Sequence, residues 1–175
     1  IILIIFIIFP FKLHALIEVD ITRGNLNPLP IAVSALYSDN ITNKALKNEI
    51  KIEKIGEEIS SVIENNLKAT GLFNPLEKKA FLQKPDVAHL KPRFEDWSLI
   101  KAQALITGKV EFKDDKVRVE FRLWDVLAAR EMLALAFTTV PNNWRRIGHI
   151  ISDKIYERLT GEKGYFDTRI IYVSE

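Results

Sequence analysis

Residues 144–175 read WRRIGHIISDKIYERLTGEKGYFDTRIIYVSE and predict a helix, a turn and the start of a strand. Apolar residues recur at the helical spacing and define one face of the helix: Trp144, Ile147, Ile151, Ile155 and Leu159. Gly161 is expected to end the helix, because glycine adopts the left-handed conformation without a steric penalty. The strand that begins at Thr168 has only a few residues left in which to find a partner. We therefore expect residues 167–175 to open a further domain.

Before this helix, three segments of strand length contain either alternating apolar and polar residues or a continuous apolar run. They are residues 104–112, 117–123 and 132–140. The pair Asp114-Asp115 separates the first two segments, and a loop centred on Ala128-Ala129 separates the last two. Three consecutive strands with short connections favour antiparallel hairpins.

The first half of the chain alternates between strand and helix patterns. Residues 31–36 (IAVSAL) are a continuous apolar run, which predicts a central strand covered on both faces. Residues 38–53 are polar and predict a surface excursion or a short helix. Residues 54–70 carry an apolar stripe at the helical period and stop at Gly71, so they predict a second long helix.

Shorter helices are expected between these elements, over residues 77–82 and 94–100. In the second of these, Phe94, Trp97 and Leu99 are the expected apolar anchors. The interleaving of helices and strands predicts an α/β fold: a mixed β-sheet with two main helices packed against it. The expected domain runs over residues 31–166.

Composition narrows the class of protein. The 175 residues are 47% hydrophobic and 27% charged, which is typical of one globular domain. Lysine and arginine number 25 against 23 acidic residues, and this near balance argues against a nucleic-acid binder. Cysteine is absent from the sequence, which excludes disulfides, thiolate metal ligands and a cysteine nucleophile.

The first fifteen residues, IILIIFIIFPFKLHA, are expected to be the remnant of a secretory signal. The apolar run over residues 1–9 is shorter than the roughly 20 residues that span a bilayer. Ala15 places a small residue where a signal peptidase cuts. A buried strand or core helix is the alternative, but no turn signal or polar alternation accompanies the run. The mature chain is therefore expected to begin near Leu16.

A strand-like segment on a flexible tether follows the expected cut. Its residues are Leu16, Ile17, Glu18, Val19, Asp20, Ile21 and Thr22. Apolar and acidic residues alternate, as in a half-buried strand, and a Gly/Asn/Pro-rich linker joins them to the domain. We call residues 16–30 the arm, and we predict that residues 16–22 bind a partner. Such a strand can pair with a free sheet edge of another protein, fold back onto its own chain as a switch, or be an ordinary edge strand.

Residues that carry chemistry are scattered. His14, His89 and His149 lie far apart, and His149 is expected to be a solvated helix residue. Asp114 and Asp115 are more typical of a turn than of a catalytic carboxylate pair. The sequence contains no nucleotide-binding, hydrolase or metalloprotease motif. We therefore predict no catalytic residues, no metal and no cofactor.

Among the three tryptophans, Trp144 is expected in the core. Trp124 continues the polar side of its strand, which makes it the expected exposed aromatic and an interface candidate.

Several short stretches, taken in order, resemble the amino-terminal domain of the TolB family of the Tol-Pal system. They are PIAV at 30–33, TGLFNP at 70–75, TGKV at 107–110, FRLWDV at 121–126, and above all ERLTGEKGYFDTRIIYV at 157–173. The resemblance implies a periplasmic domain that precedes a six-bladed β-propeller. It also implies binding of Pal, mainly through the propeller, and of TolA through the amino-terminal segment. The function implied is a scaffold, with no enzymatic activity, no nucleic-acid partner and no membrane insertion after signal cleavage, that maintains outer-membrane integrity during cell division.

Two other classes remain to be weighed. An accessory periplasmic domain that activates a cell-wall synthesis enzyme can share a mixed α/β layout, although the lipobox cysteine expected there is missing. A nucleic-acid module resembling anticodon-binding domains is disfavoured by the signal-like segment and by the near-neutral charge.

Overall fold

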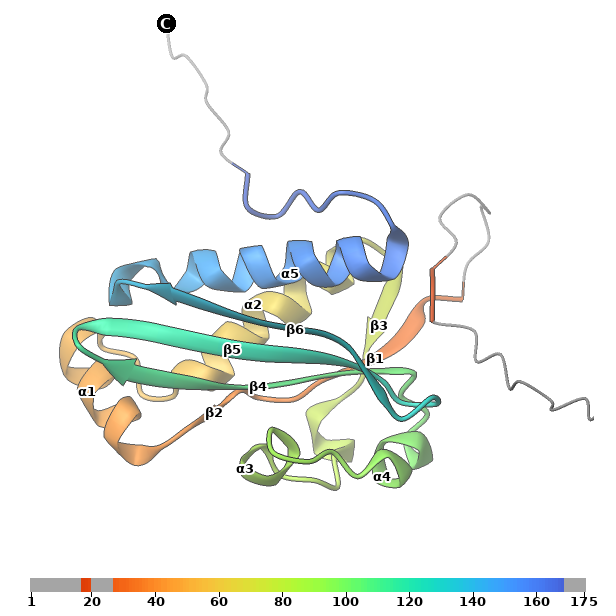
Figure 1. Cartoon of the computed structure of the whole chain (residues 1–175), viewed down its shortest axis with the longest axis horizontal. Helices are drawn as coiled ribbons and strands as arrows, with labels where there is room; N and C mark the ends of the chain where they lie inside the picture. Colours follow the sequence, from red (N-terminus) through yellow and green to blue (C-terminus); the bar gives the residue numbers. More distant parts are fainter. Residues whose placement is uncertain (1–16, 20–26, 169–175) are drawn as a thin grey trace, which may run out of the picture.

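A computed structural model describes residues 17–19 and 27–168, as one mixed sheet with helices on both faces (Figure 1). The six strands are β1 (Leu29–Val33), β2 (Tyr37–Ser38), β3 (Phe73–Pro75), β4 (Ala104–Lys113), β5 (Lys116–Asp125) and β6 (Arg130–Thr139). The helices are α1 (Asn40–Ile50), α2 (Ile55–Ala69), α3 (Pro85–Ala88), α4 (Phe94–Leu99) and α5 (Trp144–Thr160), with short 3-10 turns at Lys78–Ala80 and Pro141–Asn143. The predicted signal remnant, residues 1–15, lies outside the described residues.

The sheet has the strand order β3-β1-β4-β5-β6, and β2 extends it beside β4. β1 pairs in parallel with β3 and β4, whereas β4, β5 and β6 form the antiparallel hairpins that the sequence predicts. The mixed sheet is therefore confirmed. Asp114 and Asp115 form the first hairpin turn with φ angles of 51° and 56°, which confirms their assignment to a turn.

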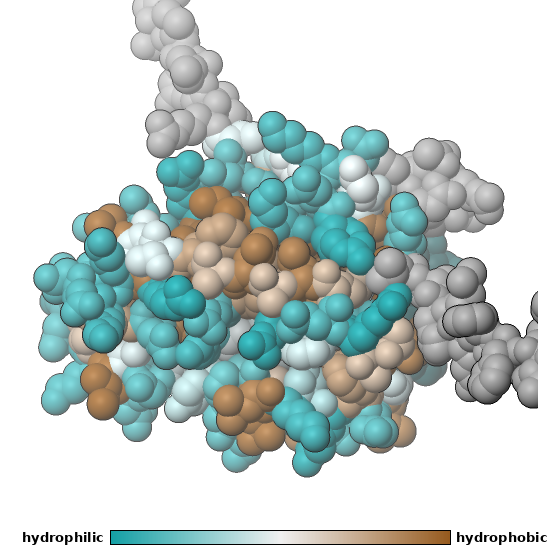
Figure 2. All heavy atoms as spheres, viewed as in Figure 1, coloured by the Kyte–Doolittle hydropathy of each residue, from teal (hydrophilic) through white to brown (hydrophobic). Residues whose placement is uncertain are grey.

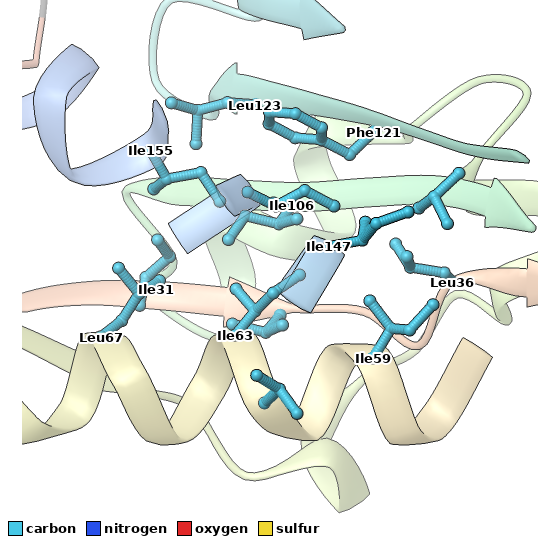
Figure 3. Packing of buried hydrophobic residues seen from close by; sticks show 14 of the residues in the cluster. Ile31, Leu36, Ile59, Ile63, Leu67, Ile106, Phe121, Leu123, Ile147 and Ile155 are labelled. Carbon is cyan, nitrogen blue, oxygen red and sulfur yellow. The ribbon is translucent and has the colours of Figure 1, made fainter. Parts of the chain in front are cut away.

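The two long helices, α2 and α5, lie side by side on one face of the sheet. Their apolar stripes point at the strands, as Figure 3 shows for Ile59 and Ile63 of α2 opposite Ile106 of β4. All three side chains have no exposed surface. The helices approach closely at Gly148, where an added Cβ would lie 2.8 Å from Val62 Cγ1. The main core thus lies between the sheet and the two long helices.

β1 is covered on both faces, as its continuous apolar sequence predicts. Ile31 and Val33 face the long helices, and Ala32 faces α3 and α4 in a second small cluster. That cluster is built on Trp97, whose indole N–H donates to Gln83 Oε1 at 3.0 Å. The expected role of Leu99 as an anchor of α4 is wrong, because 74% of it is exposed.

The polar segment 38–53 contains a short helix, α1, which is one of the two expected outcomes. Asp39 caps its amino terminus by accepting the Thr42 N–H at 2.7 Å. Hydrogen bonds from the backbone and the side chain of Thr42 lower the pKa of the Asp39 carboxyl. The short strands β2 and β3 were not predicted, because two or three residues carry no readable periodicity.

Candidate functional site

The carboxyl-terminal end of α5 is where the predicted arm meets the domain. Gly161 ends the helix with φ of 77°, and its N–H donates to the Glu157 carbonyl at 2.9 Å. The last carbonyls of a helix have no partner within the helix. One of them, the carbonyl of Leu159, accepts the backbone N–H of Val19 at 2.7 Å. The arm therefore satisfies a helix-terminal acceptor.

The side chains of the described arm residues alternate as the sequence predicts. Val19 is 9% exposed and belongs to the main core, Ile17 is half-buried against it, and Glu18 is exposed. The expected strand does not form over residues 17–19, however. Their described backbone bond goes to a helix carbonyl, so they lie at a helix end and not in the sheet. Leu16, Asp20, Ile21 and Thr22 lie outside the described residues.

A groove of about 630 Å³ runs beside this docked segment, between α5 and β6. It is lined by Ile17, Glu18, Leu133, Leu135, Lys154, Glu157, Arg158 and Gly161. Its apolar floor comes from Leu133 and Leu135, which project from β6 toward α5. β6 is the last strand of the sheet order, and Figure 2 shows a band of apolar residues across the face on which it lies.

The charged residues that α5 contributes to the rim of the groove have partners. Lys154 and Glu157 form an ion pair at 2.9 Å along α5. Arg158 Nε donates to the Met132 carbonyl of β6 at 3.3 Å, which fastens the end of α5 to the edge of the sheet. The groove therefore has an apolar floor and a rim of paired charges. Such a surface can bind an extended segment whose apolar and polar side chains alternate, as they do in the arm.

Trp124 is not the exposed aromatic that the sequence predicts. Its indole N–H donates to Thr107 Oγ1 at 2.9 Å, and its ring packs edge-on against Phe94 at 5.7 Å between centroids. α4 covers this part of the sheet, and the sequence of β5 alone does not reveal that cover. The expected core position of Trp144 is confirmed, with 8% exposed.

His149 is half-buried between the two long helices, and it is not the solvated residue expected from the sequence. Its Nδ1 lies 2.9 Å from Asn66 Nδ2, and the same amide donates to Ser152 Oγ at 3.0 Å. These contacts give His149 a structural partner on α2.

Within residues 17–19 and 27–168, no group of three or more histidine, aspartate or glutamate side chains is placed to hold a metal ion. None of the helices formed by these residues is long and apolar enough to cross a membrane. What the geometry of these residues offers is a recognition surface: an apolar groove beside β6, the last strand of the sheet order, with a peptide segment seated at one end.

The fold and this surface define a mixed α/β domain with a docked amino-terminal arm. A profile of the TolB amino-terminal domain matches residues 17–132. The chain is also 74% identical over 172 residues to the Tol-Pal system protein TolB of Pelagibacter ubique (strain HTCC1062). The chain therefore belongs to the TolB family.

The match with the Pelagibacter protein covers 98% of this chain and 39% of that relative. Among solved structures, TolB from Acinetobacter baumannii superposes with a TM-score of 0.63 at 22% identity, over 80% of this chain and 30% of that one. That likeness supports the mixed α/β fold. The chain thus spans less than half the length of either protein.

The sequence predicted the alternating burial of residues 17–19 but not the surface that receives them. The sequence REMLALAF (residues 130–137) shows that Leu133 and Leu135 lie on the same face of their strand, but it does not predict that β6 is the last strand of the sheet. The Leu159 carbonyl has no sequence signal beyond its place in the last turn before Gly161.

Proposed function

We propose that this chain is the amino-terminal domain of a periplasmic, non-enzymatic component of the Tol-Pal system. In this proposal residues 16–22 bind TolA, and the longer protein binds Pal mainly through a β-propeller that follows the domain. The assembly maintains outer-membrane integrity while the cell constricts. Membership of the TolB family supports the system, and the seat of Ile17 and Val19 at the end of α5 supports the role of the arm.

The contacts of residues 17–19 with the end of α5 are weak enough for the arm to be released. One net hydrogen bond from Val19 contributes about 0.5–1.5 kcal/mol. Burying Val19, with half of Ile17, adds about 2–4 kcal/mol at the upper limit set by full burial. Ordering three backbone residues costs about 3–6 kcal/mol. The terms nearly cancel, so docked and released arms differ by little free energy.

A nearly balanced arm is suited to a two-state role. Docked, it covers the end of α5; released, its apolar side chains and backbone can pair with the sheet edge of TolA. A partner that binds only the released arm has its affinity reduced by the docked fraction. The seat on α5 therefore acts as a competitor of TolA within the same chain.

Deletion of residues 16–22 from the full-length protein is the direct test. We expect the deletion variant to stay folded and to lose TolA binding in calorimetry. Replacing Ile17, Val19 and Ile21 with serine should weaken binding strongly. The control, Glu18→Gln with Asp20→Asn, should mainly change the salt dependence. Undiminished binding by a folded deletion variant would place the contact elsewhere.

Two further measurements address export and the second partner. N-terminal sequencing of the native periplasmic protein should begin at or near Leu16, and a retained apolar run over residues 1–9 would contradict the export assignment. A pull-down with Pal should capture the full-length protein. Capture of a cell-wall synthesis enzyme without Pal would favour the alternative of an accessory activating domain.

A further inference from the structure

The segment that follows α5 folds back along the helix that it leaves. Gly161 reverses the chain with its left-handed backbone, and residues 161–168 run over the outer side of α5 toward its beginning (Figure 1). We call this segment the strap. Unlike a flexible linker, which makes few contacts and is rich in glycine and serine, the strap is fastened at several points.

The first fastening point is the carboxylate of Asp153, in the middle of α5. It accepts the backbone N–H of Phe166 at 2.7 Å through Oδ1 and that of Asp167 at 3.1 Å through Oδ2. Bonds from backbone N–H groups to a carboxylate are among the stronger hydrogen bonds in proteins. The strap also presses against the helix at Gly164, where an added Cβ would lie 2.4 Å from Asp153 Cα.

The second fastening point lies two helical turns earlier. Arg146 is seven residues before Asp153, so both side chains lie on the same face of α5. Its Nε and Nη2 donate to the two carboxylate oxygens of Asp167, each at 3.0 Å. This bidentate pair raises the pKa of Arg146. The pair is exposed, so salt screens it.

Aromatic packing holds the middle of the strap. Phe166 and Tyr165 stand edge-on against Tyr156, with ring centroids 6.0 Å and 5.6 Å away. Tyr156 is 8% exposed and in turn contacts Phe73 of β3. Burial raises the pKa of its hydroxyl. The strap is thereby tied to the main core and not only to the surface of one helix.

We propose that the strap is a fixed joint that sets the direction in which the chain leaves this domain, with Asp153 as its positioning residue and Arg146–Asp167 as a salt-sensitive clasp. This inference rests on the function proposed above, in which a β-propeller follows the domain; the relative from Pelagibacter is longer than this chain. Reorienting the part that follows Thr168 then requires the loss of two backbone bonds to Asp153 and of one bidentate ion pair. The joint therefore resists rotation between this domain and its neighbour.

Amide hydrogen exchange in the full-length protein tests the fastening. We expect the Phe166 and Asp167 amides to be protected in the wild type and to exchange about tenfold faster, or more, in Asp153→Asn, since a hydrogen bond to a charged group is worth more than one tenfold step. The matched control is Glu157→Gln on the same helix, whose side chain pairs with Lys154 and whose backbone bond from Gly161 is kept in the variant. Arg146→Gln should have a smaller effect that disappears at high salt.

Solution scattering of the same variants tests the joint itself. The wild type and Glu157→Gln should fit one fixed arrangement of the two parts, and Asp153→Asn should broaden the distribution of distances. Gly164→Ala, which displaces the strap by steric contact, gives a second route if Asp153→Asn does not fold. Unprotected Phe166 and Asp167 amides in the wild type would overturn the proposal. So would a scattering profile that stays unchanged when the strap is released.

Discussion

Leu135→Ala is expected to strengthen TolA binding, although the substitution changes no residue of the arm. Leu135 projects from the edge strand β6 into the groove that Ile17 also lines, and 37% of it is exposed. Shortening it removes apolar lining from the groove beside the docked segment. The arm keeps every group that we propose TolA recognises, so the two effects are separated.

The magnitude follows from the carbon atoms lost. Three carbons at about 0.8 kcal/mol each would give about 2.4 kcal/mol if the contact were fully buried. Leu135 and Ile17 are both only partly covered, so we expect a loss of docking free energy of about 0.5–1 kcal/mol. Because docked and released arms are nearly balanced, the released fraction starts near one half. This fraction, and with it the apparent affinity for TolA, should therefore rise about 1.4- to 1.7-fold.

Calorimetry with TolA, combined with amide exchange at Val19, decides the matter. The Val19 N–H donates to the Leu159 carbonyl in the docked segment, so the exchange rate of this amide reports docking directly. The control Leu99→Ala makes the same chemical change on α4, at a side chain that is already 74% exposed, and should alter neither quantity. Faster exchange at Val19 with unchanged or weaker TolA binding would show that the docked arm does not compete with TolA.

Three further predictions concern the fold that carries the arm. Gly56→Ala should destabilise the domain by about 1–3 kcal/mol or more in urea unfolding, because the new Cβ would lie 1.8 Å from the Leu36 carbonyl oxygen and force backbone to move. A neutral result would show that the contact between α2 and the segment connecting β1 to β2 is looser than the structure indicates. Ser60→Ala should cost about 1–3 kcal/mol in the same assay, since the fully buried hydroxyl accepts the Leu36 N–H at 2.9 Å, and a stability within error of the wild type would contradict that role. Asp39→Ala should cost about 0.5–2 kcal/mol through the lost cap of α1. Because the folded-state pKa of Asp39 is lowered, the stabilisation by its charge is present at neutral pH and is lost as the pH falls below about 4. Asp39→Asn, which still caps the helix, should remove that part of the pH dependence. An acid unfolding curve of Asp39→Asn that matches the wild type would contradict this role of the charge.

Local patterns were sufficient wherever one element buries one face. The stripes of α2 and α5, the alternation of β5 and the apolar run of β1 each follow from the period of a single helix or strand, and all were predicted from sequence. Gly71 and Gly161 were readable as helix ends because glycine is the residue that takes positive φ at least cost.

The errors at Trp124 and His149 arose where two elements that are distant in sequence meet. Trp124 lies on the polar side of its strand, and it is covered because α4, about 25 residues earlier, packs over it. His149 lies off the apolar stripe of α5, and Asn66 of α2 supplies its partner. The error at Leu99 is local: residues two apart on a helix point to nearly opposite sides, so Leu99 is exposed where Trp97 is buried.

The sequence by itself determined the two long helices, the hairpin strands, the mixed sheet, the alternating burial of residues 17–19 and the likeness to the TolB family, since each depends on residues that are near neighbours along the chain. Only the tertiary structure decided that β6 ends the sheet, that Val19 meets the Leu159 carbonyl, and that Asp153 receives the backbone of the strap. These are pairings between a main-chain group and a distant partner. Main-chain groups are the same in almost every residue, so no side-chain pattern marks in advance which of them will meet.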